Sequence, residues 1–171
     1  LIVEEYIPGV RINQYAVLQE AGYDLADIGQ KLMLSFIKQV FKDGFFHGDP
    51  HPGNLLIYEG KIYFIDFGIT GELETGFRVS LNDMLSSFTT QDIDSMTQAI
   101  LTITTTSEPI NKLQLEQDVE RMLTKYGNLE LGSLSITDMF EDVVAICRRH
   151  HLQVPSQMAI LEKAALQIEG L

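Results

Sequence analysis

The feature that most constrains this chain is a polar loop in which two prolines stand among chemically active side chains. The loop covers residues 46–54 and reads FHGDPHPGN. Pro50 and Pro52 disfavour the α-helical conformation in the residues that precede them, Asp49 and His51. We therefore expect a stiff, extended loop that presents its side chains instead of continuing a helix. Loops of this kind, held between packed elements, are frequent positions for catalytic and binding groups.

A β-hairpin is predicted directly after this loop. Residues 55–65 form two short runs rich in β-branched and aromatic side chains, with a turn at residues 59–60. Because the chain runs out and back, we expect Asn54 and Asp66, at the two ends of the hairpin, to lie close together. Their amide and carboxylate oxygens suit a hard cation such as Mg²⁺. Asp49 can point toward the same site as a proton acceptor or as a group that orients a nucleophile.

Helices are predicted on both sides of the loop and hairpin. Residues 24–43 have apolar side chains at helical spacing, Asp24 is a good N-cap, and Gly44 supplies a left-handed stop. The wide apolar stripe indicates a core helix. Residues 1–7 are β-rich and predict a strand, which the turn at residues 8–9 ends. Beyond the hairpin, the patterns predict five further helices, over residues 75–89, 91–105, 111–126, 135–151 and 155–169.

Composition and charge exclude several classes of function. The 171 residues include 24 acids and 12 Lys and Arg, a formal net charge of −12. The excess is even: residues 1–75 have 11 acids and 5 bases, and the remainder has 13 and 7. Such a chain has no basic face for nucleic acid, and any phosphate that it handles needs a divalent cation as a screen. Cys147 is the only cysteine, which excludes an intrachain disulfide and a cysteine-based zinc site. No apolar run approaches the roughly 18 residues that cross a bilayer.

The spacing His-x-Asp-x4-Asn, followed by Asp-Phe-Gly, resembles the catalytic loop and the metal loop of protein-kinase-like folds. The fuller string HGDPHPGN, in the catalytic loop 47–54, is similar to that of the UbiB family of atypical kinases, the ubiquinone-biosynthesis kinase-like proteins. Residues 1–9 resemble the last small-lobe strand and the hinge, and residues 155–171 resemble the family's late helix. The resemblance implies a mainly α (α+β) fold, the large C-terminal lobe of a protein-kinase-like domain, with short β-hairpins at the active-site cleft. Residues 1–12 would form the hinge strand and linker, and residues 13–171 the helical lobe.

The resemblance also implies roles for single residues. Asp49 matches the catalytic aspartate, while Asn54 and Asp66, the latter in the metal loop 66–68, match the ligands of Mg²⁺. The adenine ring of ATP would lie against the hinge backbone and an apolar floor, which comprise Glu5, Ile7, Leu56 and Ile65. His47 is expected to be a packed, hydrogen-bonded structural residue and not a base.

The function implied by the resemblance is that of an ATP- and Mg²⁺-dependent atypical kinase or ATPase. It further implies a role in ubiquinone or other isoprenoid-lipid metabolism, with an isoprenoid lipid or a biosynthetic complex as partner. The chain starts without Met and lacks a small lobe, so we expect a piece of a longer protein that is cytoplasmic, membrane-peripheral or organellar. Alone, the piece should fold, remain inactive and self-associate through its uncovered half-cleft.

Two alternatives stay open. A small-molecule kinase similar to the aminoglycoside and choline phosphotransferases would share the His-Gly-Asp loop and the Ile-Asp-Phe-Gly segment. Pro50 favours the UbiB resemblance, whereas Gly48 points slightly the other way. A non-catalytic, nucleotide-sensing scaffold would keep the same nucleotide ligands and use binding as a switch.

Overall fold

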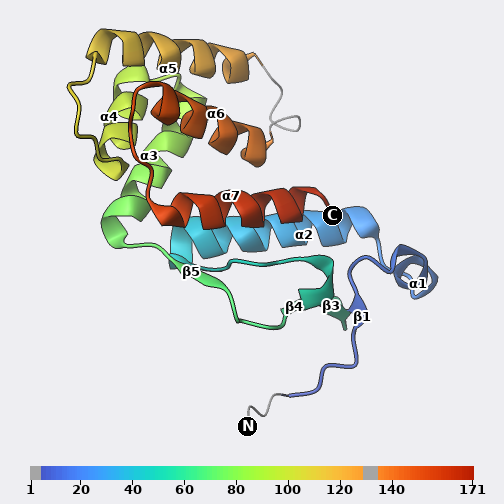
Figure 1. Cartoon of the computed structure of the whole chain (residues 1–171). Helices are drawn as coiled ribbons and strands as arrows, with labels where there is room; N and C mark the ends of the chain where they lie inside the picture. Colours follow the sequence, from blue (N-terminus) through green and yellow to red (C-terminus); the bar gives the residue numbers. More distant parts are fainter. Residues whose placement is uncertain (1–4, 129–134) are drawn as a thin grey trace. The chain divides into compact units, whose positions relative to one another are not determined.

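The computed structural model describes residues 5–128 and 135–171 (Figure 1). Within these residues the chain contains seven α-helices and five short β-strands, which confirms the prediction of a mainly α fold with small antiparallel sheets. The chain forms two compact units. The first comprises Leu1–Gly71 together with Lys163–Leu171, and the second comprises Glu72–Glu162. Across the described residues, no helix has the length and apolar character that crossing a membrane requires.

A three-stranded antiparallel sheet in the first unit holds the predicted hairpin. Its strands lie in the order β1 (Val10–Arg11), β3 (Leu55–Tyr58) and β4 (Lys61–Phe64). Strands β3 and β4 form the hairpin, in a register that places Leu55 opposite Phe64. Glu59 and Gly60 in its turn both have positive φ, 48° and 72°, and residues of this kind form the tight turns that match the twist of paired strands.

The predicted strand over residues 1–7 is wrong in its described part. Residues 1–4 lie outside the described residues, and residues 5–7 form no strand. Pairing begins at Val10, which lies opposite Ile57 of β3. In the same antiparallel register, residue 9 would lie opposite Tyr58, the last residue of β3. Residues before position 9 therefore have no residue of β3 opposite them. High β-propensity produces a strand only where a neighbouring strand pairs with it, and β3 offers none there.

The predicted long helix forms α2 and continues into a wider turn. The Asp24 carboxylate accepts a hydrogen bond of 2.8 Å from the backbone nitrogen of Ala26, so it caps α2 (Leu25–Ile37) as expected. The helix then widens into a π-helical segment, η1 (Lys38–Asp43), and ends at Gly44 with φ 70°. The π-helical segment is a difference from the prediction. Gln39 on this segment accepts a hydrogen bond of 3.0 Å from the backbone nitrogen of His47, which ties the helix to the catalytic loop.

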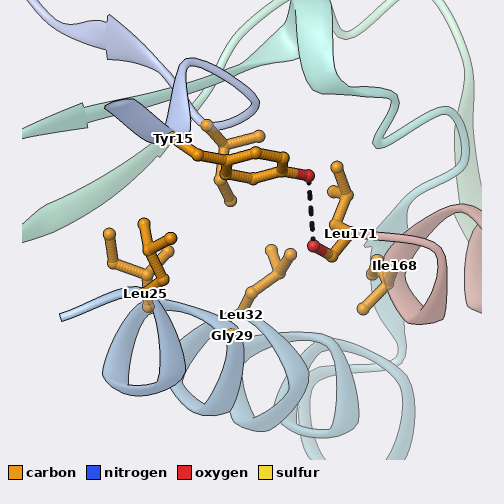
Figure 2. A pocket seen from close by; sticks show the side chains of 8 residues that line it. Tyr15, Leu25, Gly29, Leu32, Ile168 and Leu171 are labelled. Carbon is orange, nitrogen blue, oxygen red and sulfur yellow. Dashed lines mark hydrogen bonds between the residues drawn. The ribbon is translucent and has the colours of Figure 1, made fainter. Parts of the chain in front are cut away.

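The C-terminal part of α7 (Ser156–Glu169) lies alongside α2 in the first unit (Figure 1). Together with the short helix α1 (Tyr15–Glu20), which the sequence analysis did not predict, these helices line an open apolar pocket of about 280 Å³ (Figure 2). Leu32 of α2 and Ile168 of α7 are among its walls. At its rim the Tyr15 hydroxyl donates a hydrogen bond of 3.3 Å to the carbonyl of Leu171. These contacts fix the last turns of α7 within the first unit.

A second sheet pairs β2 (Phe45–His47) with β5 (Thr70–Glu72). The Phe46 side chain is completely buried, and Gly71 lies directly against it. A Cβ atom at residue 71 would come within 2.1 Å of the Phe46 ring, so the packing requires glycine there. Neither strand was predicted, because each has only three residues. The pairing brings the start of the catalytic loop beside the segment that follows the metal loop.

The second unit is helical, as predicted. It contains α3 (Thr75–Thr90), α4 (Ile93–Ile103), α5 (Lys112–Gly127), α6 (Ile136–Arg149) and the first part of α7. Asp92, Asn111 and Ser135 cap α4, α5 and α6 by accepting hydrogen bonds from backbone nitrogens of the first turn. The predicted helices are therefore confirmed, with boundaries that differ by one or two residues.

A buried carboxylate joins two of these helices. Asp118 of α5 is 3% exposed and receives hydrogen bonds from Arg149 at 2.8 Å and from the His150 ring at 2.9 Å, as well as from Arg121. A buried charge is tolerated when it is paired in this way. The basic end of α6 is thus used to compensate Asp118 inside the second unit.

Candidate functional site

The catalytic loop is extended, as its prolines predict. His51 has φ −68° and ψ 159°, and its Nδ1 atom accepts a hydrogen bond of 3.0 Å from the backbone nitrogen of Gly53. This contact caps a single 3-10 turn, η2 (Pro52–Asn54), which leads into β3. A Cβ atom at residue 53 would lie 2.7 Å from the His51 ring, so the turn and the ring position depend on glycine.

His47 joins the catalytic loop to the metal loop. Its side chain is buried, with 2% of the residue exposed. The ring Nδ1 accepts a hydrogen bond of 3.1 Å from the backbone nitrogen of Asp49, and the Nε2 atom donates one of 3.0 Å to the carbonyl of Ile65. Accepting at Nδ1 assigns the proton to Nε2. Since both nitrogens are used, His47 is a structural residue, as predicted.

Asn54 closes the catalytic loop upon itself and onto the hairpin. It is 7% exposed, and its Nδ2 atom donates a hydrogen bond of 3.1 Å to the carbonyl of Asp49. Its own backbone carbonyl accepts a hydrogen bond of 2.9 Å from the nitrogen of Ile65. The side-chain bond uses the amide nitrogen, so Oδ1 is the atom that suits a cation.

Asp66 lies directly after β4, at the same end of the hairpin as Asn54. It is exposed, has φ 59°, and its Oδ1 atom accepts a hydrogen bond of 3.2 Å from the nitrogen of Gly68. Among the described residues, no group of three or more His, Cys, Asp and Glu could hold a metal ion. One amide and one carboxylate nevertheless fit Mg²⁺, which usually keeps several waters and shares few protein ligands with substrate phosphates.

Asp49 makes contacts that the sequence analysis missed. Its Oδ1 atom accepts hydrogen bonds from Lys163 Nζ at 2.9 Å and from Gln167 Nε2 at 2.8 Å, both from α7. These two bonds hold the pKa of Asp49 below its usual value, against the smaller opposing effect of burial. The spacing of i and i+4 places Lys163 and Gln167 on one helix face. The sequence offers no signal that this face meets a loop more than a hundred residues away.

The predicted adenine-binding residues are only partly brought together. Leu56 lies in β3, and Gly9 passes so close that a Cβ atom there would be 3.0 Å from Leu56 Cβ. The segment that carries Ile7 therefore runs onto the sheet next to Leu56, while Glu5 lies in its exposed start. Ile65 is half-buried and follows β4. Their role as an adenine surface stays a prediction.

A hairpin that joins an HxDxxxxN loop to an Asp-Phe-Gly loop defines the large lobe of a protein-kinase-like protein. Comparison with known families agrees: residues 1–100 match the ABC1 atypical kinase-like domain, and residues 119–171 match the UbiB helical domain. The chain therefore belongs to the ABC1/UbiB family of atypical kinase-like proteins. This membership confirms the resemblance to UbiB and decides against the resemblance to the aminoglycoside and choline phosphotransferases.

Three relatives illustrate the breadth of the similarity. The chain is 39% identical over its whole length to a protein of Clostridium pasteurianum described as an uncharacterized protein in the hydrogenase 1 5' region. It is 31% identical over 99% of its length to an uncharacterized protein of Synechocystis. It is 28% identical over 98% of its length to Protein ACTIVITY OF BC1 COMPLEX KINASE 7, chloroplastic, of Arabidopsis thaliana. The chain spans 32%, 43% and 24% of these relatives.

Proposed function

We propose that the whole protein is an Mg²⁺- and ATP-dependent atypical kinase or ATPase, with Asp49, Asn54 and Asp66 in its phosphoryl-transfer site. The observation that carries the proposal is the hydrogen-bonded connection of the two loops. The His47 ring contacts Asp49 on one side and the residue before Asp66 on the other. Phosphoryl transfer depends mainly on positioning and on neutralisation of charge, which a rigid connection of this kind favours.

In the proposed mechanism, Asn54 and Asp66 would hold Mg²⁺, which would supply positive charge to offset that of the nucleotide phosphates. Asp49 accepts a hydrogen bond from the attacking hydroxyl or water and orients it. The lowered pKa of Asp49 keeps its carboxylate ionised at neutral pH, which suits an orienting acceptor better than a strong base. Glu5, Ile7, Leu56 and Ile65 are proposed to contact adenine.

The biological role that we propose is support of ubiquinone or other isoprenoid-lipid metabolism, with an isoprenoid lipid or a biosynthetic complex as partner. Support for it comes from the resemblance to UbiB and from the match to the UbiB helical domain.

The test uses the full-length protein and two substitutions at the site. We expect Asp66→Asn to weaken Mg-dependent ATP binding by at least about tenfold in calorimetry, because a metal ligand loses its charge. Asp49→Asn should reduce ATP turnover far more than ATP affinity. Asp94→Asn is the matched control, an exposed aspartate in the first turn of α4 that should change neither. Unchanged Mg-ATP affinity in Asp66→Asn, or unchanged turnover in Asp49→Asn, would contradict the proposed function.

A further inference from the structure

Two side chains of α7 converge on one oxygen of the catalytic carboxylate. Lys163 Nζ lies 2.9 Å and Gln167 Nε2 lies 2.8 Å from Oδ1 of Asp49. The carboxylate is partly enclosed, with 24% of its side chain exposed, while half of the Lys163 side chain is exposed. All three residues belong to the first compact unit.

We propose that Lys163 and Gln167 are positioning residues for Asp49, so that α7 supplies part of the phosphoryl-transfer site; this inference rests on the proposed function of Asp49. Asp49 lies in the part of the chain that matches the ABC1 kinase-like domain, whereas both α7 residues lie in the part that matches the UbiB helical domain. The helical domain thereby contributes two side chains to the site.

The geometry of the two bonds orients the carboxylate. Because both donors contact Oδ1, rotation of the Asp49 side chain would break two hydrogen bonds, one of them to a charged donor. Oδ2 is then the oxygen left to receive the attacking hydroxyl. Holding a catalytic group in one orientation is a large part of the rate that enzymes gain from positioning.

Gln167 has a second polar atom that the described residues leave without a partner. Its Nε2 faces the carboxylate, so the amide cannot turn over without placing its oxygen against Asp49. The Oε1 atom is consequently fixed elsewhere, where it is buried and accepts no hydrogen bond. Buried acceptors of this kind are rare and are usually completed by water or a ligand.

The experiment compares Lys163→Met, Lys163→Arg and Gln167→Met with Lys31→Met. Lys31 is a matched control, since its side chain is 52% exposed and pairs with Asp27 at 2.7 Å in α2, away from Asp49. Each variant is made in the full-length protein, and its kcat and KM for ATP are compared with those of the wild type.

Steady-state Mg-ATP turnover of the full-length protein supplies the functional readout. We expect Lys163→Met to lower kcat roughly tenfold to a hundredfold, with KM for ATP within about twofold. Gln167→Met should also lower kcat more than it changes KM, and Lys31→Met should change neither. Lys163→Arg should restore most of kcat. If Lys163→Met matches Lys31→Met in kcat, the positioning role is refuted while the proposed function stands. If Asp49→Asn leaves turnover unchanged, the proposed function itself fails, and the inference fails with it.

Discussion

Replacing His47 by phenylalanine tests whether the two functional loops are held together as the structure indicates. Phenylalanine keeps a ring of similar size in this buried position, so the change creates little cavity. It removes both hydrogen bonds of the imidazole and leaves the nitrogen of Asp49 and the carbonyl of Ile65 without their partners. The substitution therefore isolates the polar connection from the packing.

The expected loss of stability follows from these two groups. A backbone group that loses its partner costs roughly 1–3 kcal/mol, so loss of both partners in His47→Phe should lower the free energy of unfolding by about 2–6 kcal/mol. This is a large part of the roughly 5–15 kcal/mol that stabilises an ordinary domain. Urea denaturation measures the loss, and hydrogen exchange of the Asp49 amide measures the local effect separately. The amide should exchange faster in the variant.

His51→Phe is the control for this prediction. His51 is only half-buried, and its ring accepts one hydrogen bond within its own loop. We expect a loss of about 1 kcal/mol, without faster exchange at Asp49. A loss below about 0.5 kcal/mol in His47→Phe, together with unchanged exchange of the Asp49 amide, would refute the view that the ring connects the loops.

Two further predictions concern the packing of each unit. Gly71→Ala should lower the midpoint of thermal unfolding by several degrees, because the added methyl group would meet the buried Phe46 ring at 2.1 Å and overpacking costs roughly 1–3 kcal/mol. In the second unit, burial and a hydrogen bond to Asp142 raise the pKa of Tyr126 to about 12. Asp142→Asn should lower that pKa. Ultraviolet titration, with Tyr126→Phe as the reference that lacks this hydroxyl, measures it. An unchanged pKa in Asp142→Asn would contradict the prediction.

The helices and the hairpin could be predicted because their signals are local. The Asp24 side chain caps the helix by accepting a hydrogen bond from a backbone nitrogen two residues later in the sequence. Gly44 ends the helix because its φ is positive. The hairpin depends on its turn at residues 59–60 and on the runs beside it. The π-helical widening at residues 38–43 has no comparable signature, and the two short strands of the second sheet depend on a partner more than twenty residues away.

The candidate functional site also has one part that depends on local signals and one part that depends on long-range contacts. Its loop half, from His47 to Asp66, lies within twenty residues, so spacing and residue type sufficed to bring its members to one end of a hairpin. Its helix half, Lys163 and Gln167, lies more than a hundred residues from Asp49 in the sequence. Such a contact is decided by how the C-terminal part of α7 packs within the first unit. The spacing of residues in a predicted helix shows which side chains share a face of that helix. It does not show which part of the protein that face contacts. A boundary drawn between residues 100 and 119 from family matches therefore separates Asp49, the proposed catalytic residue, from the side chains that contact it, whereas the compact unit keeps them together.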